Sequence, residues 1–186
     1  MGMDIVAVSV MGANNADNIE GLDIRGTDAK NYNLLKIIDT LNEVGIVPRL
    51  SVLLHDEFTA EAKQAMNIID WCRSCNVPFV TFRNLAYYDS HKGWANDSVA
   101  SCITYVKKHQ LKSLQLRRFY NDVAKEGNQL RKLPYGAEIF GIKGVSVCIT
   151  NCLTDAIEEN EPLRNIIYYP DGRVYYDWRD EGARIF

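Results

Sequence analysis

The distribution of hydrophobic and polar residues along the chain predicts strands that alternate with helices. The apolar, β-branched run at residues 5–10 is typical of a buried strand, and turn residues from Gly12 onward end it. From Thr27, a residue type that often caps helices, apolar side chains recur at helical spacing until Gly45. The first 45 residues therefore predict a strand followed by a helix.

This pattern is repeated in the next forty residues. Residues 46–54 (IVPRLSVLL) predict a second strand, Thr59 is the expected N-cap of a helix that closes before Pro78, and residues 79–83 (FVTFR) predict a third strand. Strands that alternate with helices of this length are typical of parallel βαβ units with right-handed crossovers. We expect an α/β fold with a parallel βαβαβ core at residues 4–88.

The rest of the chain predicts helices and then strands. Residues 95–126 are helical in pattern, as two helices joined near Gln110, and residues 139–142 and 145–149 predict strands. Asp171-Gly172 between two aromatic and β-branched runs predicts a hairpin, so strands and hairpin together span 139–178. With 186 residues, 47% of them hydrophobic, the chain is long enough for one sizeable core, and we expect a single domain over residues 1–186.

The composition limits the partners and the cell compartment that we expect for this protein. The formal net charge of −3 argues against a globally cationic nucleic-acid binder. No long apolar run and no charged leader is present, so we expect a soluble, cytoplasmic protein without a membrane partner. The odd number of cysteines, five, makes a secreted disulfide framework unlikely and reduced thiols the expectation.

Two pairs of cysteines are spaced closely enough to raise the question of a metal or redox site. Cys72 and Cys75 fall in the last turn of a predicted helix, where both lie on roughly one face. A structural zinc site needs two more ligands, and a four-cysteine site with Cys148 and Cys152 would require the two pairs to converge. We favour helix packing for the first pair and assign no metal.

Three segments resemble a known family. Residues 47–87, with a charged loop after a strand, a helix that ends in Ile69-Asp70-Trp71-Cys72 and a following strand at 80–83, resemble the C-terminal half of the radical S-adenosylmethionine barrel. Residues 4–12 (DIVAVSVMG) look like the preceding strand, and residues 164–178 (RNIIYYPDGRVYYDW) look like a hairpin found after such barrels. The resemblance implies a partial (β/α) barrel with parallel strands, followed by C-terminal helices and a β-hairpin.

The chain departs from this family in the motif that holds the iron-sulfur cluster. The family uses C-x3-C-x2-C, whose three thiolates leave one iron open for the methionine moiety, and no such triplet exists here. S-adenosylmethionine and a [4Fe-4S] cluster are therefore implied only by the resemblance, and we expect neither on this chain alone. The expected protein is a truncated radical S-adenosylmethionine-like domain that is inactive alone, or a fragment of a larger enzyme.

The resemblance and the strand positions together indicate where a ligand would bind. Ligands of parallel α/β sheets bind outside the carboxyl ends of the strands. The expected cofactor-binding residues are Ser9, Arg49, Ser51 and Arg83. The alternative is that the two arginines are strand residues paired with nearby carboxylates such as Asp4 or Asp56.

A second group of candidate residues follows the second strand. His55-Asp56-Glu57 places a histidine beside two acids, which is compatible with metal ligation or general base catalysis. Only His91 and His109 remain as further histidines. We interpret the segment as a solvated loop.

The segment 107–132 supports an alternative function. It carries eight basic residues against two acidic ones. Four of the basic residues lie close to aromatic ones and could follow nucleic-acid phosphates while an aromatic ring stacks on a base: Lys107, Lys108, Arg117 and Arg118. The alternative function is a nucleic-acid or protein-binding module, although a solvated helix face is the favoured interpretation.

An open parallel sheet exposes the edge of its first strand, and such an edge favours pairing with another strand. We therefore expect either a homodimer or association with the missing N-terminal half of the barrel.

Overall fold

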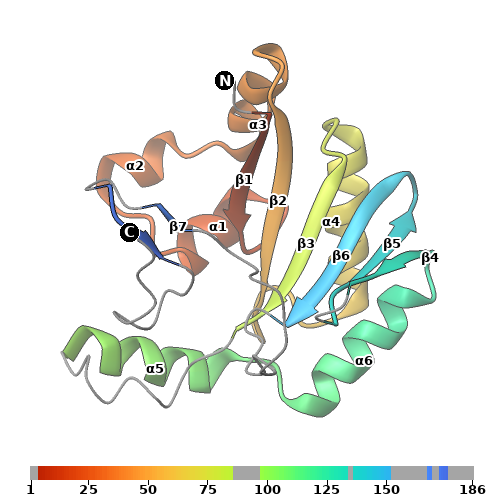
Figure 1. Ribbon diagram of the computed structural model, residues 1–186. Coiled ribbons are helices and arrows are strands. Elements are labelled where there is room, and N and C mark those ends of the chain that lie inside the picture. Colours follow the sequence, from red (N-terminus) through yellow and green to blue (C-terminus); the bar gives the residue numbers. More distant parts are fainter. Residues whose placement is uncertain (1–3, 86–96, 134–135, 152–166, 169–171, 176–186) are drawn as a thin grey trace. The chain divides into compact units, whose positions relative to one another are not determined.

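The structure, a computed structural model, describes residues 4–85, 97–133, 136–151, 167–168 and 172–175 (Figure 1). The backbone forms two compact units, Met1–Leu153 and Thr154–Phe186, and each is described by itself. No helix within the described residues is long and apolar enough to cross a membrane.

The first unit is an α/β structure around one six-stranded sheet. Its elements, in chain order, are β1 (Ile5–Val10), α1 (Asn15–Gly21), α2 (Gly26–Asn31), α3 (Leu34–Glu43), β2 (Val47–Leu54), α4 (Ala62–Ser74), β3 (Phe79–Asn84), α5 (Asp97–His109), α6 (Ser113–Ala124), β4 (Asn128–Lys132), β5 (Glu138–Ile142) and β6 (Val145–Asn151). The strand order is β1-β2-β3-β6-β5-β4, in which β1, β2, β3 and β6 are mutually parallel and β5 and β4 are antiparallel additions.

The structure confirms the α/β class and the parallel arrangement of the first three strands. Two later strands run in the opposite direction, since β5 pairs antiparallel with β6 and β4 pairs antiparallel with β5. The reason is the length of the connections. Lys143 and Gly144 form a two-residue turn with φ values of 51° and 85°, and such a turn can only reverse the chain, whereas the parallel strands are joined through helices. The sheet formed by the described strands is open, with β1 and β4 at its edges.

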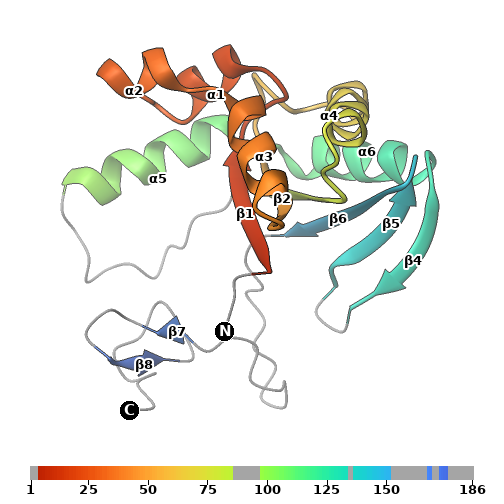
Figure 2. The same ribbon diagram turned by 90° about the horizontal axis from the view of Figure 1, so that it is seen from above.

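The hydrophobic core lies on one face of this sheet. Alternate residues of the central strands are fully buried there, among them Leu50, Val52, Leu54, Val80 and Phe82. Helices α3, α4 and α6 cover this face (Figure 2) and contribute Ile38, Ile69 and Phe119 to the same cluster. The helical spacing therefore identified much of the packing surface, but Leu35, Val44 and Leu114, which share this spacing, are exposed.

Two helix starts differ from the prediction. Thr27 lies inside α2, and the helix that carries the predicted apolar stripe begins later, at Leu34, where the Asn33 side chain accepts from the backbone N–H of Lys36. Glu61 rather than Thr59 precedes α4 and forms a reciprocal capping box with Gln64. Thr59 is buried and donates its hydroxyl to the Met11 carbonyl at 2.6 Å, so a tertiary contact replaces the expected local one.

Most of the helices and strands after β3 were predicted from the sequence, and one strand was not. Helices α5 and α6 are separated at Gln110, as predicted, and strands β5 and β6 fall where apolar runs predicted them. Strand β4 was not predicted, because its residues (NQLRK) are all exposed and carry no apolar alternation. In the second unit, β7 (Ile167–Tyr168) and β8 (Val174–Tyr175) pair antiparallel, which confirms the predicted hairpin.

Candidate functional site

The face of the sheet opposite the core, the polar face, carries a row of polar side chains across its middle, which is unusual for parallel strands; Leu53 and Phe79 lie on the same face. Parallel sheets are normally apolar on both faces. Here one row across four strands, read from the strand register, is Ser9, Ser51, Thr81 and Cys148. A face that is polar in the middle of a parallel sheet is a candidate ligand-binding surface.

All four predicted cofactor-binding residues lie on this polar face. Arg49 and Ser51 alternate along β2, Ser9 is the register partner of Ser51, and Arg83 is the register partner of Leu53 on the same face. Ser9 is exposed, Arg49 and Arg83 are half-buried, and Ser51 is only 7% exposed. The structure therefore brings the four residues to one face of the sheet.

Neither arginine forms the carboxylate pair that the alternative interpretation required, as far as the described residues show. Arg49 donates from Nε and Nη2 to the hydroxyl of Thr81, at 3.1 and 2.7 Å. The Nε atom of Arg83 is buried and has no hydrogen-bond partner among the described residues, and the same holds for Oδ1 of Asn84. Buried polar atoms without a protein partner are the atoms that a ligand or ordered water would satisfy.

Cys72, Cys75 and Cys148 do not converge on one site. Cys72 packs in the core between α4 and the sheet, where burial raises the pKa of its thiol to about 12, and Cys75 follows as the residue that caps α4. Cys148 alternates with the core residues Val147 and Ile149, so its side chain lies on the opposite, polar face. The sheet therefore separates Cys148 from the other two, and a site shared by the two predicted pairs is not compatible with the fold. Cys152 lies outside the described residues.

A second feature, a histidine cluster, lies at the carboxyl edge of the parallel strands. His55 follows β2 directly and is fully buried. The loop that it opens is closed by two backbone hydrogen bonds with Thr59, from the His55 N–H at 3.3 Å and from the Thr59 N–H at 3.0 Å. This closure places Asp56 and Glu57 at the tip of a tight loop.

This loop contacts His109, the last residue of α5. Helix α5 lies at the carboxyl ends of the parallel strands (Figure 1). His109 is 5% exposed, and its ring stacks on that of His55 with centroids 4.5 Å apart and 19° between the planes. The Asp56 carboxylate lies between them, with Oδ1 2.8 Å from Nδ1 of His109 and 3.3 Å from Nδ1 of His55. The backbone N–H of Asp56 also donates to the His109 carbonyl.

The hydrogen bonds around His55 define its tautomer. The backbone N–H of Glu57 donates to Nδ1 of His55 at 3.1 Å, so this nitrogen carries a lone pair and Nε2 carries the proton. Nε2 then faces the hydroxyl of Tyr105 at 2.9 Å. Burial lowers the pKa of His55 and the neighbouring His109 lowers it further, against the opposing effect of Asp56 and Glu57, which favours the neutral ring.

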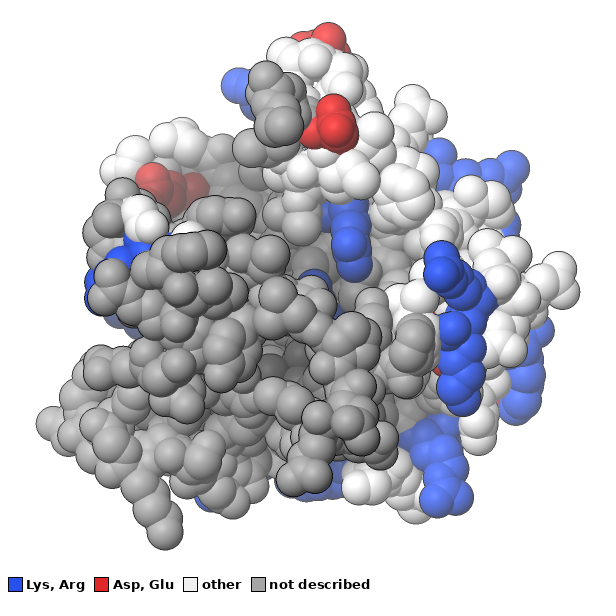
Figure 3. All heavy atoms as spheres, in the orientation of Figure 1, with Lys and Arg blue, Asp and Glu red and all other residues white. Residues whose placement is uncertain are grey.

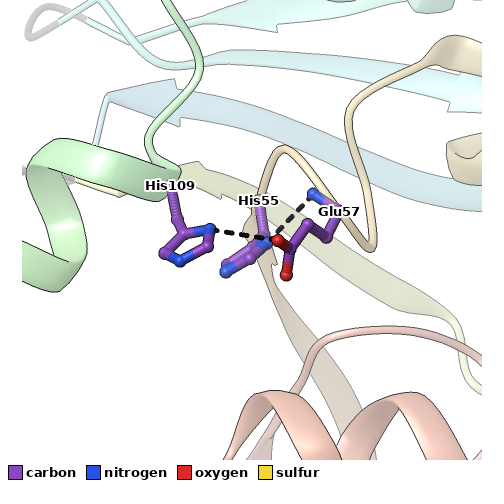
Figure 4. Close-up of side chains that lie close together, drawn as sticks. All are labelled: His55, Glu57 and His109. Carbon is purple, nitrogen blue, oxygen red and sulfur yellow. Dashed lines mark hydrogen bonds and ion pairs between the residues drawn. The ribbon is translucent and has the colours of Figure 1, made fainter.

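The carboxylate of Glu57 completes the cluster (Figure 4). Its Oε1 lies 3.8 Å from Nδ1 of His109, and one ligand atom from each of His55, Glu57 and His109 falls within 4.8 Å of the others. The interpretation of residues 55–57 as a solvated loop was wrong for His55. Its spatial partner could not be seen in the sequence, because His109 lies 53 residues beyond Asp56.

The loop that follows β1 is fixed against this edge by Asn18, which is fully buried in α1. The amide oxygen of Asn18 accepts from the backbone N–H groups of Met11 and Gly12, and the amide nitrogen donates to the carbonyls of Gly12 and Asn14. The Met11 carbonyl in turn accepts from Thr59 in the histidine loop. The loops after β1 and β2 are therefore held together as one rigid edge.

The residues of the alternative, nucleic-acid interpretation lie on the surface. Lys107 and Lys108 are exposed in the last turn of α5. Arg117 and Arg118 are exposed on α6, whose Phe119 and Val123 are buried. The structure thus brings the four to the surface of two consecutive helices.

Comparison with known proteins does not assign the chain to a family. No protein-family model matches it, and no curated protein matches it. A function is accordingly argued from the features of the structure itself: the polar sheet face, the histidine cluster and the basic side chains on the surface.

Proposed function

We propose that the chain is a radical S-adenosylmethionine-like domain without its own iron-sulfur cluster, and that the polar face of its parallel sheet binds S-adenosylmethionine. The observation that carries the proposal is the polar row Ser9, Ser51, Thr81 and Cys148 across strands that would otherwise be apolar on both faces. A partial barrel would explain the polar residues, because this face of the sheet would line the inside of the completed barrel, where ligands bind.

The chemistry of the face suits the amino-acid end of this ligand. Guanidinium groups bind carboxylates through charge-assisted hydrogen bonds, often with two bonds at once. Arg49 is oriented by Thr81, and none of the described residues takes its Nη1. Arg83 adds a second guanidinium on the same face, and the hydroxyls of Ser9 and Ser51 can bond the ammonium or ribose groups.

Completion of the barrel requires a partner at the open edge. Strand β1 pairs with β2 alone among the described strands, and Ile5 on it is 51% exposed. A second copy of the chain or a polypeptide that carries the first half of the barrel would pair with this edge. The polypeptide that supplies the first half would also supply the cluster, and the domain alone is then inactive.

The test of ligand binding is calorimetric titration of the full chain with S-adenosylmethionine. We expect saturable binding that weakens at least about tenfold in Arg49→Met, which corresponds to the loss of one charge-assisted bond. Lys63→Met, on the exposed side of α4, removes a charge far from the polar face and should bind as the unchanged chain does. No saturable binding, or equal loss in both variants, would contradict the proposal.

The absence of a resident cluster is tested separately by anaerobic reconstitution with iron and sulfide. We expect no stoichiometric acid-labile sulfide and no broad visible absorption of a four-iron cluster; iron alone would not decide the question, because histidine and carboxylate side chains also bind Fe²⁺. A reconstituted cluster at one per chain would refute this part of the proposal while leaving ligand binding to the titration.

A second candidate function, binding to nucleic acid, is favoured by one observation. Lys and Arg side chains gather over β4, β5 and α6 on the face shown in Figure 3, with little Asp or Glu among them. Salt-dependent retention on heparin that is lost in the double variant Arg117→Glu, Arg118→Glu would support this function. Retention that does not respond to salt would count against it.

A further inference from the structure

We propose that His55, Glu57 and His109 bind a divalent transition-metal ion of the zinc class at the carboxyl edge of the sheet, with Asp56 in position as a fourth ligand. This site is separate from the proposed S-adenosylmethionine face, and neither depends on the other. Two imidazoles with carboxylates are the donor set that zinc and similar ions prefer, whereas magnesium and calcium prefer oxygen ligands alone.

The separations between the donor atoms suit one ion. With metal–ligand bonds of about 2.0–2.1 Å, tetrahedral geometry holds the donor atoms roughly 3.3–3.4 Å apart. Three of the observed separations lie around this value: 2.8 Å from His109 Nδ1 to Asp56 Oδ1, 3.3 Å from His55 Nδ1 to Asp56 Oδ1, and 3.8 Å from His109 Nδ1 to Glu57 Oε1. The ligand atoms of His55, Glu57 and His109 all lie within 4.8 Å of one another, so the cluster has to contract when it takes up an ion. Figure 4 shows His55, Glu57 and His109 pointing toward one another from the β2 loop and the end of α5.

The protein also prepares one ligand for the metal. Nδ1 of His55 already carries a lone pair on the side of the carboxylates, because Nε2 holds the proton and faces the Tyr105 hydroxyl. Metal-bound histidines typically have the second ring nitrogen hydrogen-bonded in this way, which fixes both tautomer and orientation. The ion would take the lone pair that now accepts from the Glu57 N–H. His109 would have to present its other tautomer, in which the proton leaves Nδ1 and Nε2 takes one up from solvent, so that Nδ1 offers a lone pair and the ring stays neutral.

Binding requires side chains of the cluster to move. Asp56 and Glu57 are exposed, whereas the two histidines are buried and their rings stack on each other. Because the stacked rings have only 19° between their planes, their in-plane lone pairs do not yet converge on one point. One imidazole has to turn about its side-chain torsions while Asp56 and Glu57 move inward, and the sheet itself need not rearrange. Without an ion, the same contacts form a hydrogen-bonded lock between β2 and α5.

The experiment is titration of the untagged full chain with Zn²⁺, by equilibrium dialysis and by the shift in melting temperature. We expect one ion per chain, a rise in melting temperature, and no response to Mg²⁺ or Ca²⁺ at the same concentrations. His109→Asn should weaken zinc binding by more than the roughly 10–100-fold typical of changes outside the ligand set, and Glu57→Gln by at least about tenfold. Glu43→Gln, an exposed acid at the end of α3, is the matched control and should change nothing.

Spectra of the Co²⁺-substituted chain identify the donor atoms. We expect the visible bands of nitrogen and oxygen ligands without the near-ultraviolet charge transfer of a thiolate. Three results would overturn the proposal: no stoichiometric zinc, zinc affinity retained in Glu57→Gln, or a thiolate band that assigns the ion to the cysteines. Because Glu57 is exposed and lies outside the core, its variant decides the question even if His109→Asn does not fold.

Discussion

The amide of Asn18 provides a sharp test of how the edge of the sheet is held. It makes four hydrogen bonds, to Met11 N at 2.7 Å, Gly12 N at 3.2 Å, Gly12 O at 3.0 Å and Asn14 O at 2.8 Å, and it is fully buried. Replacement by Ala leaves two buried N–H groups without their acceptor. Each such group costs about 1–3 kcal/mol, so we expect Asn18→Ala to lower the free energy of unfolding by about 3–4 kcal/mol.

Urea denaturation followed by circular dichroism measures this change. With a urea dependence of about 2 kcal/mol per molar, the midpoint should fall by roughly 1.5–2 M. Asn18→Asp should be at least as destabilising at neutral pH, because a carboxylate oxygen would replace the donor that faces two carbonyls. Asn67→Ala, an exposed position within α4, is the matched control and should lose nothing.

A different outcome would refute the reasoning. If Asn18→Ala lost less than about 1 kcal/mol with an unchanged urea dependence, the loop after β1 would not depend on this amide. If Asn18→Asp were as stable as the unchanged chain, the donor half of the amide would contribute nothing.

Three further predictions concern other buried contacts. Burial raises the pKa of Cys72 to about 12, so at pH 8 about one thiolate in ten thousand is present, and peptide mapping after alkylation should show Cys75 labelled long before Cys72. Burial and a hydrogen-bonded carboxylate, that of Glu138 on β5, raise the pKa of Tyr120 to about 12, so the stability that Tyr120 contributes is present below pH 10 and lost as the pH rises through 12. Tyr120→Phe should lower the free energy of unfolding by about 1 kcal/mol at pH 8. Urea denaturation at pH 8 and 11 should show that the variant loses less stability between these two pH values than the unchanged chain does. A Cβ at Gly127 would lie 2.4 Å from a backbone oxygen of β5, so Gly127→Ala should lower stability by about 1–3 kcal/mol, whereas Gly141→Ala, with its nearest contact at 3.4 Å, should be tolerated; equal effects would contradict this packing.

The local pattern of hydrophobic and polar residues was sufficient to predict the parallel strands. It was insufficient for features that are set by contacts between segments far apart in the chain. The strands at 5–10, 46–54 and 79–83 were recognisable because apolar β-branched runs report burial directly. Strand β4 has no such signal, since an exposed edge strand needs only backbone partners. Thr59 was expected to cap a helix but donates to the Met11 carbonyl, because a buried hydroxyl takes the partner that the tertiary fold presents.

The candidate site divides in the same way. Alternation along each strand already placed Arg49 and Ser51 on one face, and the parallel topology brought Ser9 and Arg83 beside them. The pairing of His55 with His109 depended on where α5 ends relative to β2. The sequence by itself determined the strands, the helices and the sides to which their residues point, because these follow from periods of two and 3.6 residues. Only the tertiary structure decided that two buried imidazoles and two carboxylates meet, because that contact is set by the packing of elements far apart in the chain.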